Sequence, residues 1–489
     1  MLLNRYNGFA VFLTLLLMLS TVPISCGIER QEGKPTYYHI AQEGGRNITE
    51  FSENVLLSTR DLPYAHHVEP TIAVSDNGTL FAGWKNSETH NGGGARVSVA
   101  KSVDGGTTWT DPYNIDYFGE EPTRQSDPWL VWYEDTLFYA YLEYSLTDTD
   151  FTQMTVARME NYSGGWIPVK ASYNDYFADK ETMVIAEDGT IYVVYDDADT
   201  SSAEGNVTIR VSRSTNGGLT FEEVGVIGWP DPGHLGPYAT LNEEGHLFVA
   251  WTWVDETYTG NLYIAKSTDM GETFDTPKII NMDGNFSKFT SVDGRPAKST
   301  LPVIRFDQQG RLILLWADTF DPTAHSFDIY MRVSLDEGDT WSERFQVNPQ
   351  TIGDQWQPDM DIDSEGNLHI VYYDESFEEY RPFYLTATFS DEEDDSPEFS
   401  DPISIAEVST SSTFTRPGDY FTIRLDQNDR PHVVWSDGRN DEMDIFYAHG
   451  VFESDIPVPM DQTTLTIIVV VLIASIAVVV IFFVLRRRS

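Results

Sequence analysis

The sequence is poor in cysteine and in basic residues, and each shortage excludes a class of protein. Cys26 is the only cysteine among 489 residues, so no disulfide can form within the chain. Lys and Arg number 31 against 77 Asp and Glu, which gives a formal net charge of −46 at pH 7. Such a surface repels phosphate backbones and anionic lipid headgroups. We therefore expect no nucleic-acid partner.

Helical periodicity is also missing between residues 54 and 450, where runs of strand length repeat instead. Seven stretches share two apolar or alternating runs around a turn rich in Asp, Asn and Gly. They begin at Glu69, Asp127, Lys180, Gly236, Leu301, Gln357 and Tyr420. A third run and a looser fourth follow most of them, which indicates four antiparallel strands per repeat. A closed ring of such sheets buries every sheet face against a neighbour. We predict an all-β fold, a β-propeller of seven four-stranded blades, with six blades as the alternative count.

The first and last repeats indicate how the ring closes. The seventh repeat has three evident strands and ends at residues 444–450, so its outer strand is missing. The segment Asn54–Asp61 precedes the first repeat and resembles the other outer strands. We predict that this N-terminal strand completes the seventh blade and joins the two ends of the propeller.

A shorter motif recurs inside the repeats as SVDGGTTW, STNGGLTF, STDMGETF and SLDEGDTW. Its Asp or Asn side chain suits acceptance of backbone NH groups, its Gly suits a positive φ, and its aromatic residue suits packing between sheets. We interpret all four copies as hairpin turns that hold the scaffold. The residues with these roles are Ser102, Asp104, Gly106 and Trp109; Ser214, Asn216, Gly218 and Phe221; Ser267, Asp269, Gly271 and Phe274; and Ser334, Asp336, Gly338 and Trp341.

These four copies resemble the Asp-box, or BNR repeat, of the sialidase-like β-propeller superfamily. The resemblance covers residues 67–450. It implies that the Asp-boxes lie on the face opposite the active site, together with the turns that join first and second strands. Function is then expected on the other face, where loops lead into each first strand and join second to third strands.

The residues expected on that face include acids, arginines and aromatics. The candidates for catalysis are Arg295, Arg416, Arg439, Asp127, Tyr420 and Glu375. The candidates for ligand binding are Asp179, Lys180, His234, Trp356 and Asp437. A sialidase holds the substrate carboxylate with three arginines, and the family places the first of these in the first blade. Here the corresponding segment reads Val68-Glu69-Pro70-Thr71, without that arginine. Arg295, Arg416 and Arg439 are the alternative clamp, and pairing with the abundant carboxylates is the competing interpretation.

Two further groups of charges remain. Arg305, Arg424 and Asp361 occupy one register on first strands, with Asp359 two residues earlier, and we interpret them as an ion-pair network in the central channel rather than a ligand site. Asp196, Asp197 and Asp199 offer oxygen ligands for Ca²⁺, but their spacing is not that of a calcium loop. Ca²⁺ is therefore the one cofactor option left open, and no transition metal is expected.

The two ends of the chain have the composition of targeting segments. Arg5 precedes the apolar run Gly8–Leu19, as in a secretory signal peptide. Thr463–Leu485 is uncharged over 23 residues and is followed by three arginines, which places the tail in the cytoplasm and the propeller outside the cell. The expected divisions are a signal peptide at 1–27, an extension at 28–53, the propeller at 54–450, a stalk at 451–462, a membrane helix at 463–485 and a basic tail at 486–489.

Three functions fit these observations. The leading hypothesis is a membrane-anchored, cell-surface propeller that binds a glycan or another surface ligand through its loop face. The second is a sialidase-type exo-glycoside hydrolase acting on acidic sugars. The third is a structural envelope or adhesion protein. The missing first-blade arginine favours binding over hydrolysis.

Overall fold

The computed structural model describes residues 47–58, 64–88, 93–118, 123–145, 152–160, 165–172, 177–199, 205–256, 259–281, 287–288, 291–292, 295–296, 301–319, 327–350, 352–376, 379–391, 395–411 and 417–455. The expected signal peptide, membrane helix and basic tail lie outside these residues. Within them, no helix is both long enough and apolar enough to cross a membrane.

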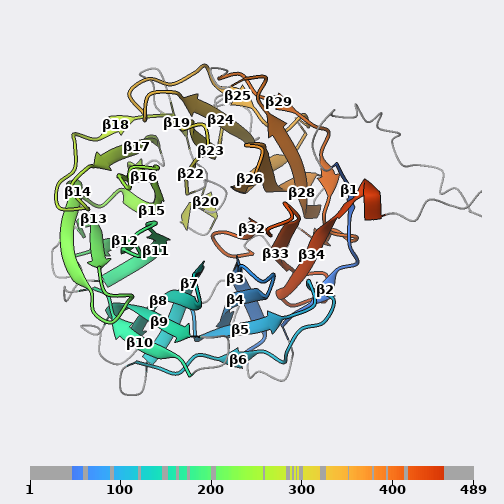
Figure 1. Cartoon of the computed structure of the whole chain (residues 1–489), viewed down its shortest axis with the longest axis horizontal. Helices are drawn as coiled ribbons and strands as arrows, with labels where there is room; N and C mark the ends of the chain where they lie inside the picture. The colour runs from blue at the N-terminus through green and yellow to red at the C-terminus, as the bar shows by residue number, and fades with distance from the viewer. Residues whose placement is uncertain are drawn as a thin grey trace, which may run out of the picture. The chain divides into compact units, whose positions relative to one another are not determined.

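Seven antiparallel sheets form the blades of a propeller, which settles the blade count at seven (Figure 1). Blade 1 is β3 (His66–Val74), β4 (Leu80–Ser87), β5 (Arg96–Ser102) and β6 (Tyr113–Asn114). Blade 2 is β7 (Thr123–Tyr133), β8 (Thr136–Ser145), β9 (Thr152–Glu160) and β10 (Ile167–Lys170), and blade 3 is β11 (Phe177–Ile185), β12 (Ile191–Ala198), β13 (Val207–Ser214) and β14 (Glu222–Asp231). Blade 4 is β15 (His234–Leu241), β16 (Leu247–Val254), β17 (Thr259–Ser267) and β18 (Lys278–Ile279), and β19 (Ser287–Lys288) also pairs with β17.

The remaining blades follow the same order from the channel outward. Blade 5 is β22 (Val303–Phe306), β23 (Leu312–Asp318), β24 (Asp328–Ser334) and β25 (Phe345–Gln346). Blade 6 is β26 (Asp354–Ile362), β27 (Leu368–Ser376) and β28 (Glu379–Thr388), with three short outer strands β29 (Glu398–Phe399), β30 (Ile403–Ser404) and β31 (Thr410–Ser411). Blade 7 has β32 (Thr422–Leu425), β33 (Pro431–Asp437) and β34 (Asp444–Phe452), followed by the 3₁₀ turn η1 (Glu453–Asp455). A two-stranded hairpin, β20 (Ser291–Val292) and β21 (Arg295–Pro296), follows blade 4 and precedes blade 5 in the chain, and Figure 1 shows β20 toward the centre of the ring.

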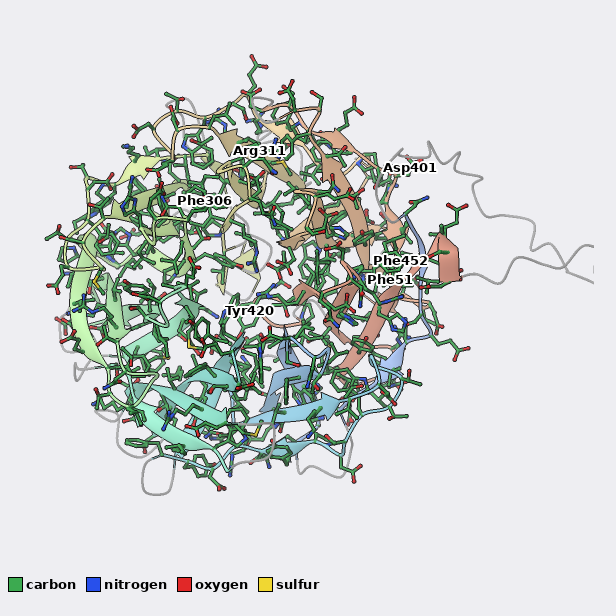
Figure 2. The ribbon with its side chains drawn as sticks, in the orientation of Figure 1. Phe51, Phe306, Arg311, Asp401, Tyr420 and Phe452 are labelled. Atoms are coloured by element: carbon green, nitrogen blue, oxygen red, sulfur yellow. The ribbon has the colours of Figure 1, made fainter. Side chains whose placement is uncertain are left out.

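The N-terminal segment closes the ring, as the missing outer strand of the seventh repeat predicts. β2 (Val55–Leu56) pairs with β34 through Val55 opposite Tyr447. β1 (Ile48–Phe51), in a segment expected to be an extension, pairs with β34 as well. Figure 2 shows Phe51 and Phe452 at the same edge of the ring. The edge of β34 is therefore covered by the chain's own N-terminal part, which leaves no open strand there.

One aromatic residue per blade fills the core at the same place on the second strand. These residues end the apolar runs of the seven repeats and are at most 1% exposed: Trp84, Tyr141, Tyr195, Trp251, Trp316, Tyr372 and Trp435. Burial of an aromatic side chain removes a large apolar area from water. The repeated pattern in the sequence thus gives each interface between blades an equivalent anchor.

The Asp-box turns are scaffold parts, and their hydrogen bonds match the roles assigned from the sequence. In the first copy the Asp104 Oδ1 accepts the Thr108 amide at 2.9 Å and its Oδ2 accepts the Thr108 hydroxyl at 2.6 Å. The turn contacts the neighbouring blade, because a Cβ on Gly106 would lie 2.1 Å from the Tyr447 hydroxyl of β34. Trp109 packs edge-on against that same ring at 5.0 Å. Each such turn therefore joins two blades.

The first-to-second-strand turns share the face of the Asp-boxes, as expected. Asn242, in the turn between β15 and β16, donates its side-chain amide to Glu337 of the fourth Asp-box at 2.7 Å. Lys266 on β17 also contacts Glu337. The opposite face carries the loops that lead into the inner strands.

Candidate functional site

A one-residue bulge recurs at the same place in five of the innermost strands. In β3 the pairing with β4 passes from Val68 opposite Lys85 to Thr71 opposite Gly83, so three steps on β3 match two on β4. β7, β11, β15 and β26 show the same shift. The first bulged residue has positive φ in every case: Glu69 (56°), Asp127 (51°), Lys180 (53°), Gly236 (62°) and Gln357 (49°). Four of these are not glycine, and left-handed backbone at such residues concentrates at functional sites.

The bulges direct polar side chains to one end of the central channel. Lys180 Nζ lies 3.0 Å from Asp127 Oδ1 and also contacts the Asp419 carboxylate. Carboxylate oxygens of Glu69, Asp127 and Asp419 all lie within 4.8 Å of one another. Gln357 donates its side-chain amide to the Gly418 carbonyl at 2.6 Å. We call the cluster Glu69, Asp127, Lys180 and Asp419 the channel mouth. It joins blades 1, 2, 3 and 7.

Acidic groups outnumber bases around the channel mouth. Lys85 contacts Glu69 Oε1 at 2.5 Å, so two lysines serve the three acids of the cluster. Asp179, Glu181 and Asp196 lie close enough to influence the same charges. Six carboxyl groups therefore face two ammonium groups in a partly desolvated site. Some of these carboxyl groups must remain protonated or bind a cation, because unpaired buried charges are costly.

The surroundings lower the pKa of one of these acids and raise the pKa values of others. Burial opposes ionisation of Asp127, but the charges of Lys180 and Lys85 outweigh it and hold its pKa below the ordinary value. Burial and the charge of Asp127 raise the pKa of Asp179 to about 6. Burial, followed by the charge of Asp127, raises the pKa of Glu181 well above its usual range, and neither Glu181 oxygen has a hydrogen-bond partner within the described residues. The mouth thus holds Asp127, whose pKa is lowered, together with Asp179 and Glu181, whose pKa values are raised.

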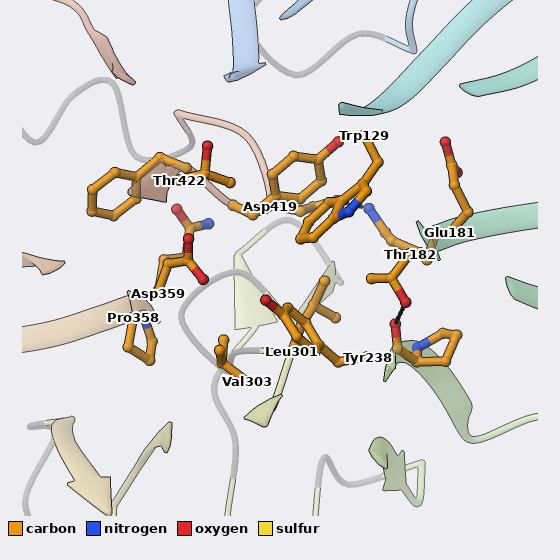
Figure 3. A pocket seen from close by; sticks show the side chains of 15 residues that line it. Trp129, Glu181, Thr182, Tyr238, Leu301, Val303, Pro358, Asp359, Asp419 and Thr422 are labelled. Carbon is orange, nitrogen blue, oxygen red and sulfur yellow. Dashed lines mark hydrogen bonds and ion pairs between the residues drawn. The ribbon is translucent and has the colours of Figure 1, made fainter. Parts of the chain in front are cut away.

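A narrow cavity continues from the channel mouth toward the middle of the ring (Figure 3). Its volume is about 30 Å³, enough for only one or two water molecules. Trp129, Tyr238 and Tyr420 form its aromatic wall, with Trp129 edge-on to Tyr238 at 5.6 Å and to Tyr420 at 5.8 Å. The Tyr420 hydroxyl donates to the Pro128 carbonyl at 2.6 Å. A larger ligand would therefore lie over the mouth, against the partly exposed Asp179, Lys180 and Asp419.

Hydrogen bonds between inner strands hold the mouth in place. The Thr71 hydroxyl in blade 1 accepts the Leu130 amide of blade 2 at 3.2 Å. The Thr422 hydroxyl in blade 7 accepts the Ile72 amide of blade 1 at 2.9 Å. Both hydroxyls lie next to the mouth cluster, because Thr71 closely follows Glu69 and Thr422 closely follows Asp419 in the chain. Neighbouring inner strands are thereby fixed in register next to the bulges.

Four of the residues nominated from the sequence meet at the channel mouth or its wall: Asp127, Asp179, Lys180 and Tyr420. Two others cannot be placed there. Arg416 lies outside the described residues, and Arg295 lies in β21 with its side chain outside them.

The other nominated residues have local structural partners. Arg439 lies 2.5 Å from Asp437 and donates to Asn54 of the closing segment at 3.1 Å. Trp356 is 1% exposed and stacks on Tyr373 at 4.7 Å. His234 accepts the Trp251 indole NH at 2.9 Å on its Nδ1, and burial lowers its pKa. Glu375 lies near the end of β27, where its backbone is opposite Asp354 of β26.

The sequence analysis did not single out Glu69, Glu181 or Lys85, and it gave Asp419 no role. A signal was present: a residue followed by Pro opens five of the seven repeats, as in Glu69-Pro70 and Asp127-Pro128. Proline within a strand pattern indicates an edge or a bulge. That position gives Glu69 and Asp127 of the mouth, whereas Lys180 has no proline after it and Leu301-Pro302 precedes a strand without a bulge.

Glu69, Asp127 and Asp419 are also the described group best suited to hold a divalent cation, since carboxylate oxygens are the ligands that Ca²⁺ prefers. The Lys180 ammonium already bridges Asp127 and Asp419, so a cation would compete with it. Two of the three aspartates considered for Ca²⁺ have other partners. Asp196 accepts the Gly236 amide at 3.0 Å, whereas Asp197 lies 2.5 Å from Arg210.

Comparison with known proteins agrees with the architecture. No protein-family model matches the chain, and no curated protein is significantly similar in sequence. An ulvan lyase of polysaccharide lyase family PL25 superposes with a TM-score of 0.50 at 10% identity, over 80% of this chain and 95% of its own. The GH93 α-L-arabinofuranosidase of Fusarium graminearum superposes with a TM-score of 0.48 at 14% identity, over 83% of this chain and 99% of its own. A Trypanosoma rangeli sialidase in complex with sialic acid superposes with a TM-score of 0.47 at 13% identity, over 83% of this chain and 58% of its own. The chain has a seven-bladed β-propeller fold with Asp-box turns, as the resemblance to sialidase-like propellers predicts.

Proposed function

We propose that this protein is a carbohydrate-active propeller and that the channel mouth is its sugar site. The observation that carries the proposal is the convergence of bulged inner strands from separate blades on Asp127, Lys180 and Asp419. A sugar presents hydroxyl groups that both donate and accept, and the mouth offers carboxylate acceptors beside an ammonium donor. Structures of this fold that act on polysaccharides add an analogy of fold only.

The charge of the mouth favours neutral sugars over acidic ones. Six carboxyl groups surround two lysines, and no arginine belongs to the cluster within the described residues. Arg124, one of the arginines on this face, is paired with Glu88 at 2.9 Å. A sugar carboxylate would meet like charge here, which disfavours its binding. We therefore propose neutral glycans as ligands, in place of the acidic sugars that the family resemblance implies.

Binding tests this proposal directly. The full-length protein would be titrated calorimetrically with matched neutral, uronate-containing and sialylated oligosaccharides. We expect the neutral compounds to bind best and Asp419→Asn to weaken them by about tenfold or more, the scale of a lost charge-assisted hydrogen bond. Lys278→Met, which removes an exposed lysine paired with Asp339 far from the mouth, is the matched control. A preference for sialylated compounds that Asp419→Asn does not change would refute the assignment.

Hydrolysis is the second candidate, because the acids at the mouth differ in protonation. Asp179, partly exposed and with its pKa raised to about 6, can donate a proton to a leaving group, while ionised Asp127 beside it can act as the base or stabilise positive charge. We expect release of nitrophenol from neutral aryl glycosides at pH 5 and a decline as the pH rises through about 6. Asp179→Asn should abolish release, while the control Lys278→Met should leave it unchanged. Absence of turnover at pH 5 across a panel of neutral glycosides would leave binding as the function.

The location of the protein remains a proposal from the sequence. We propose that Thr463–Leu485 anchors the chain and that the propeller faces outward. Protease added to intact cells should then cleave the propeller and spare the basic tail. Protection of the propeller from protease in intact cells would contradict this orientation.

A further inference from the structure

The central channel contains a second cavity, on the other side of Trp129 and Tyr238 from the mouth. It has a volume of about 350 Å³, and Trp129 and Tyr238 line both cavities. Val74 and Leu241, the last residues of β3 and β15, line the second cavity, so it lies toward the turns between first and second strands. Those turns share a face with the Asp-boxes. We call this cavity the box-side chamber.

The lining of the box-side chamber holds more basic than acidic groups, unlike the mouth. The charged residues that line it, among those described, are Arg305, Arg424 and Asp361. Arg305 donates its Nε to the Met360 carbonyl at 2.7 Å, and its NH1 is 3.9 Å from Asp361. Asp361 also accepts the Leu425 amide at 2.8 Å, which satisfies part of its charge. Asp359, which lies outside the chamber lining, pairs with Arg424 at 2.9 Å, so each arginine has a carboxylate nearby and the ion-pair network expected in the central channel is present.

Both guanidinium groups keep donors for a ligand. Arg424 uses NH1 for Asp359 at 2.9 Å and for a backbone carbonyl, and its guanidinium lies 5.7 Å from the Trp129 ring centre. The side chains of Arg305 and Arg424 are 24% and 16% exposed, so water in the channel reaches them. Arginine presents five N–H donors in a fixed fork, and only some of them are used here.

Most of the remaining chamber wall is apolar. Val74, Ile185 and Leu241 line it and are only half-buried. The Tyr238 hydroxyl oxygen lies within reach of the Arg305 guanidinium, and the hydroxyl has no acceptor of good geometry within the described residues. A buried hydroxyl in this state gains from a ligand oxygen.

We propose that the box-side chamber binds a small amphipathic organic anion, with its charged head between Arg305 and Arg424 and its apolar tail against Val74, Ile185 and Leu241. A volume of about 350 Å³ falls within the range of small-molecule pockets, and a few placed polar groups in an apolar wall are typical of them. Carboxylates and phosphate esters share the head chemistry that guanidinium recognises. This site is separate from the proposed sugar site at the mouth. It lies toward the Asp-box face, where the family resemblance does not predict a functional site.

Calorimetric titrations of the full-length protein with four compounds distinguish the contribution of the charged head to affinity from that of the apolar tail. The compounds are hexanoate, hexyl phosphate, hexan-1-ol and acetate. We expect one or both six-carbon anions to bind with a Kd below about 1 mM, and hexan-1-ol and acetate to bind at least about tenfold more weakly. The ratio of hexanoate to hexyl phosphate identifies the preferred head. Equal affinity for hexanoate and hexan-1-ol, or no binding of either anion up to about 10 mM, would overturn the proposal.

Two variants locate the site. Arg305→Gln should weaken the preferred anion by about tenfold or more, because a charge-assisted contact is lost. Arg213→Gln, which removes an arginine paired with Glu222 outside the channel, is the control and should bind normally. Ile185→Phe occupies chamber volume without changing charge and should weaken binding as well. Anion binding that survives both Arg305→Gln and Ile185→Phe would place the site elsewhere.

The mouth serves as an internal reference in these experiments. Asp419→Asn should leave anion binding unchanged, and Arg305→Gln should leave glycan binding unchanged, since Trp129 and Tyr238 lie between the two cavities. Loss of anion binding in Asp419→Asn would assign the anion to the mouth and refute the chamber.

Discussion

Lys180 of the third blade and Asp419, which precedes the inner strand of the seventh, form an ion pair at the channel mouth. Asp127 of the second blade contacts the same ammonium at 3.0 Å. Blades 3 and 7 are not neighbours in the ring, so this contact spans the channel.

Removal of the lysine should therefore cost more than the loss of a surface ion pair. Lys180→Met leaves two largely buried carboxylates without a counter-charge, and we expect a loss of about 3–5 kcal/mol in the free energy of unfolding. The measurement is urea unfolding at pH 7.5. Lys278→Met, at an exposed pair with Asp339, should lose less than about 1 kcal/mol. A similar small loss for Lys180→Met would mean that the mouth acids are neutral at this pH.

The raised pKa of Asp179 makes stability depend on pH in a definite direction. Its folded pKa of about 6 exceeds the ordinary Asp value near 3.9, so the folded state holds a proton that the unfolded state releases. The free energy of unfolding consequently falls as pH rises from about 4 to about 6. Asp179→Asn removes this loss, and we expect a gain on the order of 1–3 kcal/mol at pH 7.5 and no difference below pH 4.

Asp188, in the same blade, is a control because its pKa is shifted in the opposite direction from that of Asp179. Hydrogen bonds from Thr190 lower the pKa of Asp188, so its contribution is present above the unfolded pKa and is lost as pH falls through the folded value. Asp188→Asn should not be more stable than the parent at pH 7.5. Parallel pH profiles of unfolding for Asp179→Asn and Asp188→Asn would contradict the raised pKa of Asp179.

The first Asp-box offers a matched pair of adjacent glycines. Gly105 and Gly106 both have positive φ, at 69° and 90°. A Cβ on Gly106 would lie 2.1 Å from the Tyr447 hydroxyl, whereas a Cβ on Gly105 meets nothing within 4 Å. We expect Gly105→Ala to cost about 1 kcal/mol for backbone strain alone. Gly106→Ala should cost about 1–3 kcal/mol more, because Tyr447 must move. Equal melting temperatures for the two variants would show that the turn does not hold blade 7.

Ring closure depends on one asparagine that contacts two blades. Asn54 donates to the Ile405 carbonyl of blade 6 at 3.0 Å and accepts from Arg439 of blade 7 at 3.1 Å. It also accepts the Glu407 amide at 3.0 Å. Asn54→Ala should lower the free energy of unfolding by about 1–3 kcal/mol and raise hydrogen exchange of β1 and β2. Glu53→Ala, at the exposed neighbour, should change neither quantity.

The repeats made the architecture readable because each carries the same local pattern. A turn rich in Gly and Asp between two apolar runs, seven times over, predicts strands, their order and their number. The closing strand was readable as well, since the seventh repeat lacks an outer strand and Val55 supplies it. These features depend on residues that are close in sequence.

The site was less readable because it depends on residues brought together from distant repeats. The most distant members of the cluster of Asp127, Lys180 and Asp419 are 292 residues apart in the chain, the same separation as between Tyr420 and Pro128. These residues meet only once the ring is closed. A positive φ at a non-glycine residue leaves little trace in a sequence. Asp437 and Arg439, by contrast, looked like site residues and pair with each other, as expected where carboxylates are abundant.

The repeated bulge has a consequence for how such a protein changes over time. The first bulged residue of each inner strand is an insertion outside the regular pairing, so its side chain is not required by either face of the sheet. Glutamate, aspartate, lysine, glycine and glutamine occupy that position in five blades of one chain without altering the strands around it. Exchange of this residue in one blade can therefore change the polar groups at this end of the channel while the pairing of the strands stays the same.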